Sequence, residues 1–241
     1  MLACCARGAI LILALWSGAA MADDLDDFNA GVEGAAAHNR VAIGYLRTGN
    51  TDLASLEIDR LREAWSKLAT RFAGKRPEVF AGNPLYAGLW TGASARLVAA
   101  DLMLKTGRPE AAAGALNALR GDLYDLRKAS KVVVLADCVR DANTVMDAFM
   151  AYNDRALDWA KPEVSSDVAR KAASYGDILK RCDGIANAAV RNNPEFRRLV
   201  DGARASLEFI PKAIASRDAD LLHRVLIELR SFDNLLAFRF G

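Results

Sequence analysis

Apolar residues recur every three or four positions along nearly the whole chain, which is the spacing of one face of an α-helix. Alternation of apolar and polar residues, which is typical of a half-buried strand, never continues for long. Lys131–Leu135 is the one run with a β-strand character. The hydrophobic content of 52% is mainly alanine and leucine, whereas aromatic residues make up 7%. This pattern predicts an all-α protein.

The apolar stripes predict about eight helices, several of them longer than 20 residues. Their approximate ranges are 26–47, 53–72, 85–105, 109–126, 130–159, 166–182, 196–210 and 222–236. Ser165 or Ser166 is the expected cap of the sixth helix. Long helices joined by short turns favour antiparallel hairpins, packed as one eight-helix bundle or two four-helix bundles. We expect N-terminal hairpins over residues 23–128 and C-terminal hairpins over 129–241, with one continuous domain as the alternative.

Residues 1–22 have the organisation of a removable secretory signal. Arg7 is the only charged side chain, Ala9–Trp16 is an apolar run too short to anchor the chain in a bilayer, and Ala20-Met21-Ala22 is a small-x-small triplet. We therefore expect cleavage between Ala22 and Asp23 and a mature protein that is periplasmic or secreted. No second apolar run reaches spanning length, so no membrane span is expected after the signal is removed.

The charge of the mature chain is close to zero. The 32 basic residues include Arg7, so 31 remain against 30 acidic residues, a formal charge of +1. Binding to nucleic acid requires a concentrated basic face that neutralises phosphates, so we expect no nucleic-acid partner. The sequence predicts no particular oligomeric state.

One local pattern occurs three times, in Leu46–Arg62, Leu104–Arg120 and Ile214–Arg230. Each segment has the end of a helix, a tight polar turn, an acidic residue in the next first turn and then a Leu-Arg pair. The stretches Tyr45–Ala54 and Met103–Ala112 resemble the turn and second helix of a tetratricopeptide hairpin. That resemblance implies a helical solenoid, which is the second candidate fold. Gly49 and Gly107 are 58 residues apart, against about 34 in that repeat, so a bundle is the preferred prediction.

Two cysteines, Cys138 and Cys182, remain after removal of the signal, which carries Cys4 and Cys5. They lie on the apolar stripes of two sequential helices that should pack antiparallel. In an oxidising compartment such a pair favours a disulfide bond between the helices. Two separate buried thiols, or a reactive or metal-binding pair, are the alternatives.

Metal binding has one candidate set. Met146 and Met150 lie one turn apart on the helix that carries Cys138, and soft sulfur ligands of this kind bind Cu(I). A copper site would combine Cys138, Met146, Met150 and Cys182, although methionines at helical spacing more often fill a core. His38 and His223 have no second ligand one turn away, and the sequence has no Cys-x-x-Cys-His haem motif. We expect no cofactor.

Catalytic motifs are absent from the sequence. No Gly-x-Ser-x-Gly turn or phosphate-binding glycine loop occurs, and the many carboxylates are dispersed over polar helix faces. The chain is therefore predicted not to be an enzyme.

The C-terminal residues Phe238, Arg239 and Phe240 combine side-chain types that often anchor protein interfaces. Burial of Phe232, Leu235, Leu236 and Phe240 in the bundle is the alternative interpretation. The preferred functional hypothesis is an exported, non-catalytic helical protein that binds an exported partner protein or assists assembly of an exported system. The second hypothesis is a periplasmic carrier of copper or a small ligand, with its site inside the bundle.

Overall fold

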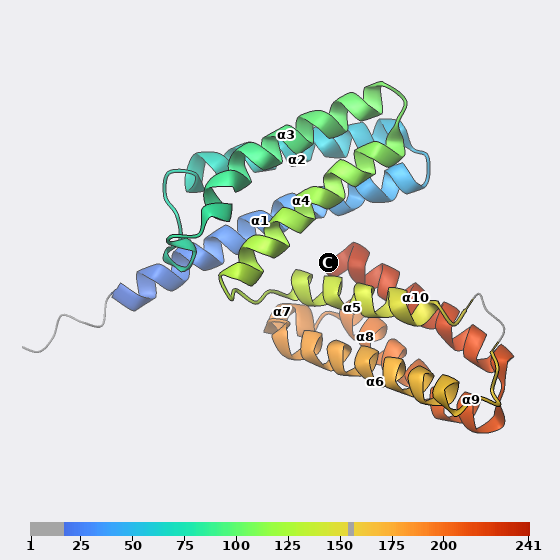
Figure 1. Cartoon of the computed structure of the whole chain (residues 1–241). Coiled ribbons are helices and arrows are strands. Elements are labelled where there is room, and N and C mark those ends of the chain that lie inside the picture. The colour runs from blue at the N-terminus through green and yellow to red at the C-terminus, as the bar shows by residue number, and fades with distance from the viewer. Residues whose placement is uncertain (1–16, 154–156) are drawn as a thin grey trace, which may run out of the picture. The chain divides into compact units, whose positions relative to one another are not determined.

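The structure is a computed structural model that describes residues 17–153 and 157–241 (Figure 1). Its helices, in chain order, are α1 Ser17–Arg47, α2 Thr51–Phe72, the 3-10 helix η1 Glu78–Phe80, α3 Pro84–Lys105, α4 Pro109–Ala129, α5 Leu135–Met150, α6 Pro162–Ile185, α7 Ala188–Arg191, α8 Pro194–Leu207, α9 Ile210–Ser216 and α10 Ala219–Phe240. None of the described residues lies in a strand, which confirms the all-α prediction. The chain divides into two compact units, unit 1 ending at Ser130 and unit 2 beginning at Lys131.

The predicted signal sequence lies mostly outside the described residues, because the description begins at Ser17. From Ser17 the backbone of α1 is helical across the expected cleavage position between Ala22 and Asp23. Among the helices of the described ranges, none combines the length and apolar character needed to cross a membrane.

Unit 1 is a four-helix bundle in which α1 and α3 each pack against both α2 and α4. An aromatic cluster fills one end of its core. The ring of Phe28 lies 5.5 Å from that of Phe72 and 5.2 Å from that of Phe80, both in edge-to-face contact. Tyr86 stacks on Phe80 at 5.3 Å and donates a hydrogen bond to the carbonyl of Phe72 at 2.7 Å. These contacts hold η1 and the start of α3 against α1.

Unit 2 is a second four-helix bundle, built from α5, α6, α8 and α10. Helices α6 and α10 each contact both α5 and α8, and the short α9 contacts α6 and α10. The core consists of buried apolar side chains from all four long helices, including Phe149, Val168, Leu179, Phe196, Leu199, Leu226 and Leu229. The packing of long helices around one core is that of a bundle rather than of a solenoid.

Two expected helices are longer in the prediction than in the structure. The fifth was expected over 130–159, but α5 covers Leu135–Met150. Lys131 has a left-handed φ of 57° and Val134 is extended, which fits the preference of the β-branched run before α5 for extended backbone. The seventh was expected to continue to Ile210, but α8 ends at Leu207. Pro211 has no amide hydrogen, and its ring would clash with the carbonyl of Leu207 four residues earlier.

The start of the sixth helix also differs from the prediction. Neither Ser165 nor Ser166 caps it, because α6 already begins at Pro162. Proline suits the first helical position, where an amide has no helical acceptor. Ser166 is inside the helix, and its hydroxyl donates to the carbonyl of Pro162 at 3.1 Å.

The repeated sequence pattern forms the same helix-ending turn three times, after α1, α3 and α9. In each turn an amide bonds back to a carbonyl five residues earlier at 2.8–2.9 Å; the pairs are Asn50 to Tyr45, Arg108 to Met103 and Asp218 to Ala213. The residue before each donor has a positive φ: 76° at Gly49, 70° at Gly107 and 54° at Arg217. This is the Schellman motif, and its third copy has arginine where the first two have glycine.

Replacing Arg217 with glycine should therefore stabilise the protein. A side chain in the left-handed region costs about 1 kcal/mol, which is partly offset by the greater freedom of glycine in the unfolded chain. We expect the free energy of unfolding of Arg217→Gly to rise by about 0.5 kcal/mol, measured by urea unfolding followed by circular dichroism. Gly107→Ala, at the equivalent position of unit 1, should lower it by about 1 kcal/mol. A destabilised Arg217→Gly protein would contradict this account of the turn.

Candidate functional site

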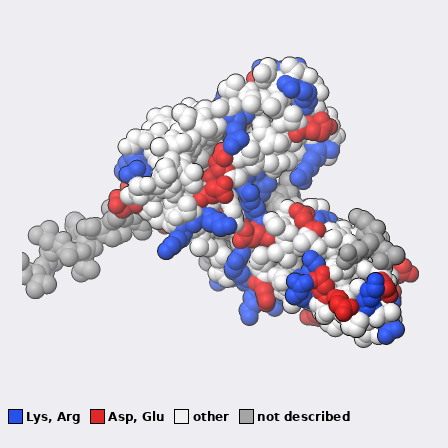
Figure 2. Space-filling view, in the orientation of Figure 1, with Lys and Arg blue, Asp and Glu red and all other residues white. Residues whose placement is uncertain are grey.

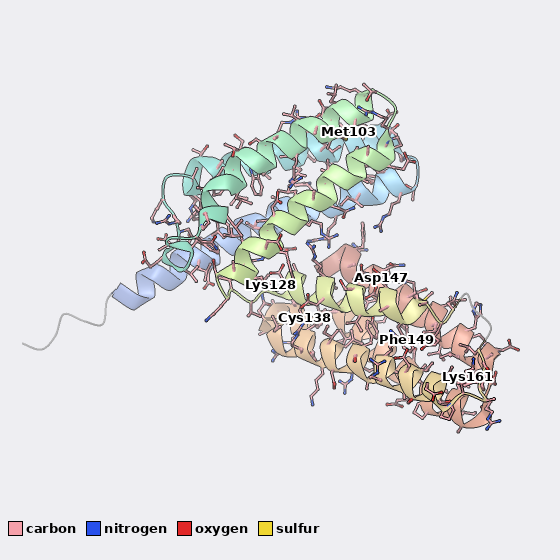
Figure 3. All side chains as sticks on the ribbon, viewed as in Figure 1. Met103, Lys128, Cys138, Asp147, Phe149 and Lys161 are labelled. Atoms are coloured by element: carbon pink, nitrogen blue, oxygen red, sulfur yellow. A yellow bond between two sulfur atoms is a disulfide. The ribbon has the colours of Figure 1, made fainter. Side chains whose placement is uncertain are left out.

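Cys138 and Cys182 form a disulfide bond. Cys138 of α5 and Cys182 of α6 are bonded, with their Cα atoms 5.5 Å apart, and both residues are buried (Figure 3). The bond closes a sequence separation of 44 residues. This confirms the predicted pairing and fixes α5 against α6 inside unit 2.

The sulfur atoms proposed as copper ligands have other roles in this structure. The sulfurs of Cys138 and Cys182 are bonded to each other. Met146 is fully buried in the core of unit 2, and Met150 packs against that core. Within residues 17–153 and 157–241, no group of three or more histidine, cysteine or acidic side chains is arranged to hold a metal ion. A copper site made of these four residues would therefore require the reduced protein.

The predicted partner-binding residues belong to the last turn of α10. Phe240 packs edge-to-face on Phe196 of α8 at 5.1 Å, so its ring belongs to the bundle. Arg239 forms an ion pair with Glu195 at 3.2 Å. Phe238 is 37% exposed and shares an outer face of α10 with Ile227 and Leu235. Of the three predicted residues, Phe238 is the one whose large apolar side chain faces solvent.

The two histidines have different environments. His38 is half-buried in unit 1, where its Nδ1 lies 2.7 Å from Glu57 Oε2, and His223 is exposed on α10. Burial by itself raises the pKa of Glu57, but hydrogen bonds from His38 and Arg60 outweigh it and hold that pKa below its ordinary value. This pair connects α1 to α2.

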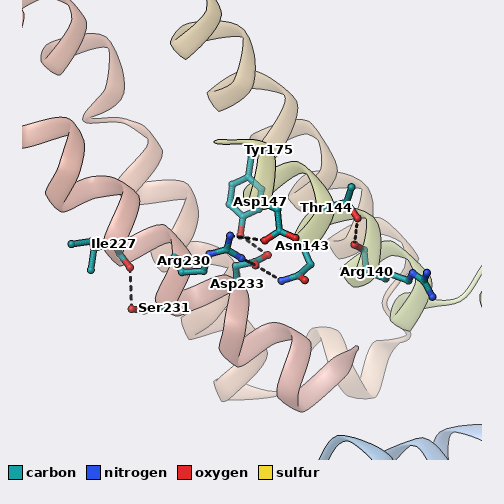
Figure 4. A network of polar contacts seen from close by, with 9 residues as sticks. All are labelled: Arg140, Asn143, Thr144, Asp147, Tyr175, Ile227, Arg230, Ser231 and Asp233. Carbon is teal, nitrogen blue, oxygen red and sulfur yellow. Dashed lines mark hydrogen bonds and ion pairs between the residues drawn. The ribbon is translucent and has the colours of Figure 1, made fainter. Parts of the chain in front are cut away.

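A buried carboxylate in unit 2 escaped the sequence analysis. Asp233 of α10 is fully buried, and it lies where α5, α6 and α10 meet (Figure 4). Asn143 of α5 donates to its Oδ2 at 2.5 Å, and the hydroxyl of Tyr175 of α6 donates to its Oδ1 at 3.3 Å. Arg230 lies 3.3 Å from Oδ2 and also pairs with Asp147 of α5 at 2.6 Å. The network joins three of the four long helices.

Burial governs the protonation of this network. It raises the pKa of Asp233 from 3.8 to about 6, although Asn143, Arg230 and Tyr175 favour the charged form. Burial and the adjacent carboxylate also raise the pKa of Tyr175. Asp233 occupies a core position, since Leu229 and Leu236 on the same stripe are buried as well. The sequence signal that could have identified Asp233 is an aspartate at helical spacing between two leucines.

An apolar groove of about 620 Å³ lies on unit 2 between α6 and the α8–α9 corner. Small residues of α6 form one wall, namely Ala169, Ala172, Ala173 and Gly176. The other wall consists of Leu207, Ile210, Pro211 and Ile214. The carboxylates of Asp177 and Glu208 are the charged groups of its lining, and the groove is open to solvent.

The local sequence explains why this groove exists. Pro211 ends α8 and turns the chain into α9, so that apolar side chains of α9 stand beside α6. The facing residues of α6 are three alanines and Gly176, which are too small to fill the space beside α9. The sequence signals were Pro211 and the spacing of Ala169, Ala173 and Gly176.

No protein-family model matches the chain, no curated protein matches it, and no solved structure matches it. The groove and the exposed apolar faces are the features of the described residues that bear on function.

The disulfide should make a large contribution to the stability of unit 2. In the loop-entropy account, closing a loop of 44 residues stabilises a protein by about 4 kcal/mol. We expect the double variant Cys138→Ala/Cys182→Ala to lose about 2–4 kcal/mol of unfolding free energy, measured in urea without reductant. Mass spectrometry after alkylation under denaturing conditions should show no modified Cys138 or Cys182 in the parent protein. Stoichiometric alkylation of both would contradict the bond.

The buried carboxylate should make stability depend on pH. Because the folded-state pKa of Asp233 is raised, the folded protein binds more protons than the unfolded chain between about pH 4 and pH 6. Its contribution to stability is thus present below pH 4 and is lost as the pH rises through 6. Asp233→Asn keeps a neutral hydrogen-bonding group, so the variant should gain about 3 kcal/mol relative to the parent between pH 4 and pH 8. Parallel stability curves for the two proteins, measured by urea unfolding across that pH range, would contradict this account.

Proposed function

We propose that this chain is an exported, non-catalytic helical protein that binds a partner protein through the groove between α6 and α9. The observation that carries the proposal is the groove itself, whose two walls are apolar and open to solvent. Apolar grooves between helices receive the apolar face of a partner helix, with side chains inserted at helical spacing. A volume of about 620 Å³ accommodates a few such side chains.

The charge of the groove supports a partner with basic side chains. Asp177 and Glu208 are exposed, and neither carboxylate has an ion-pair partner among the residues that the structure describes. Lys180, three residues after Asp177 on α6, and Lys212 of α9, four residues after Glu208, form no ion pair with these carboxylates. Two unpaired carboxylates beside an apolar groove favour a ligand in which lysine or arginine flanks the apolar residues.

Export is supported by two separate features. The composition of residues 1–22 is that of a secretory signal. The Cys138–Cys182 bond is of a kind that persists in oxidising compartments and is rare in the cytosol. The proposed partner is accordingly another exported protein.

The outer face of α10 is a second surface for the same function. Ile227, Leu235 and Phe238 are 47%, 39% and 37% exposed on this one face. These three side chains come from a single helix, whereas side chains from α6 and the α8–α9 corner together line an open groove. The groove is therefore the primary candidate, and Phe238 provides the comparison variant.

The alternative function, a carrier, is restricted to a small apolar ligand in the groove. A copper site would need the free sulfur atoms of Cys138 and Cys182, which are bonded to each other. Carrier sites normally enclose most of the surface of their ligand. This groove is open along one side, which favours a segment of a larger partner.

A peptide-display experiment tests the proposal. The purified protein is used to select binders from a phage library of random sixteen-residue peptides. We expect enriched peptides with apolar residues at helical spacing flanked by lysine or arginine. Ala173→Trp, which fills the groove, should weaken the best peptide at least about tenfold, because its apolar side chains can no longer enter. Asp177→Asn/Glu208→Gln should weaken binding and reduce its dependence on salt.

Two matched controls make the result specific. Ala189→Trp adds the same side chain at an exposed site on α7 and should bind peptide as the parent does. Phe238→Ser tests the outer face of α10. Binding that survives Ala173→Trp but is lost in Phe238→Ser would move the site to α10. Absence of any enriched peptide, together with tight binding of the neutral dye N-phenylnaphthylamine that Ala173→Trp abolishes, would favour the carrier instead.

A further inference from the structure

The outer face of α3, in unit 1, carries a regular seam of uncharged exposed residues. Its members are Pro84, Gly88, Thr91, Ala95, Val98 and Leu102. They are spaced four, three, four, three and four residues apart, which is the spacing of the contact positions in a two-helix coiled coil. All six are exposed, and Val98 and Leu102 are 62% and 56% exposed. We call these six residues the α3 seam.

The opposite side of α3 is apolar as well. Tyr86, Leu89, Ala93 and Leu97 are buried in the core of unit 1. Between Pro84 and Ala100 the one charged residue is Arg96, which turns toward α4 and contacts Asp122 at 2.5 and 2.9 Å. The surface of unit 1 over α3 is accordingly mainly white in Figure 2. A helix that is apolar on all sides is normally buried on all sides, so the exposed seam indicates a missing neighbour.

The order of side-chain sizes along the seam indicates what that neighbour is. The two largest side chains of the seam, Val98 and Leu102, lie at its C-terminal end, and the smaller Pro84 and Gly88 lie at its N-terminal end. If a second α3 is laid antiparallel with the two-fold axis near residue 93, Leu102 faces Pro84 of the other copy, Val98 faces Gly88, and Ala95 faces Thr91. Each larger side chain then meets a smaller one, which allows close packing.

A parallel arrangement does not have this property. It would place Val98 against Val98 and Gly88 against Gly88, leaving a gap along the N-terminal half. The absence of charge on the seam also favours self-association. A two-fold interface brings identical residues together near its axis, and uncharged residues do not repel each other there. We infer that the α3 seam is an antiparallel homodimerisation surface of this protein. This inference is independent of the groove in unit 2.

The extent of the seam sets the strength of the dimer. At 1.5 Å per residue it is roughly 30 Å long, and a strip about 10 Å wide amounts to roughly 300 Å² per copy. Stable protein interfaces bury about 800 Å² per partner. The dimer should therefore be weak and form progressively as the protein concentration rises from micromolar to millimolar.

Disulfide trapping tests the antiparallel register. The variants Gly88→Cys and Val98→Cys are prepared separately in a chain that begins at Asp23, so that Cys4 and Cys5 are absent, and are then mixed under mild oxidation. A Cβ at Gly88 meets no atom within 4 Å, and Val98 is exposed, so both variants should fold. We expect the mixture to form an inter-chain bond between residues 88 and 98, identified by mass spectrometry, and each variant alone to form much less dimer. Efficient trapping of Val98→Cys with itself would overturn the antiparallel arrangement.

Gly114→Cys is the matched control for trapping, since Gly114 is an exposed glycine on α4 with open space at its Cβ. It should not be trapped with Val98→Cys above the background of random collisions. Sedimentation velocity gives a second readout. The mean mass of the parent should rise with concentration, Val98→Glu should remain monomeric, and Gly114→Glu should behave as the parent does. A parent protein that is monomeric up to millimolar concentration, or equal trapping at residue 114, would overturn the inference.

Discussion

The position of helix α6 is the constraint on which unit 2 depends. The Cys138–Cys182 bond ties α6 to α5, and the Tyr175 hydroxyl ties it to Asp233 of α10. Its apolar stripe also contributes Val168 and Leu179 to the core. With its inner face held in this way, α6 cannot roll or slide to bury the small residues on its other side. The groove beside α9 is thus a consequence of how firmly the rest of α6 is fixed, because close packing would otherwise favour closure of the apolar walls.

The Asp233 network fixes the orientation of α10 as well as its contact with α5 and α6. A core of leucine and valine alone would tolerate α10 at several rotations and heights, since apolar contacts are not directional. The carboxylate reaches Asn143 on α5 and Tyr175 on α6 in one arrangement of the three helices. Burying the carboxylate costs free energy, but it restricts α10 to one rotation and height against α5 and α6. In unit 1 the buried Asn39 of α1 donates to the carbonyl of Leu116 of α4 at 3.1 Å, and the Arg96–Asp122 and His38–Glu57 pairs link its helices nearer the surface.

Much of the fold could be predicted from the sequence because helix periodicity and turn chemistry are local. Gly49 and Gly107 mark the ends of α1 and α3, and the apolar stripes mark the buried faces. The disulfide could be predicted because two cysteines lay on the apolar faces of sequential helices. The breaks were harder to place: Val132–Val134 and Pro211 interrupt stripes that continue in register on either side.

The candidate site was not predictable in the same way. The groove depends on the distance between α6 and α9, and residues 169–177 and 207–215 are brought together by the bundle rather than by any local pattern. Asp233 was overlooked because its buried state depends on donors supplied by two other helices. The C-terminal residues were predicted as one binding unit, yet Phe240 packs inward and Phe238 points outward. Residues two positions apart on a helix point about 200° away from each other, so Phe238 and Phe240 lie on opposite sides of α10 although they are close in sequence.

We propose the groove between α6 and α9 as the site where this protein binds its partner. Amide hydrogen exchange, followed by mass spectrometry with and without a saturating concentration of a selected peptide, tests it most directly. The account predicts that exchange slows in residues 169–177 of α6 and 207–215 at the α8–α9 corner, while α10 and unit 1 are unchanged. Protection confined to the outer face of α10 or to unit 1, with the groove exchanging as in the free protein, would contradict it.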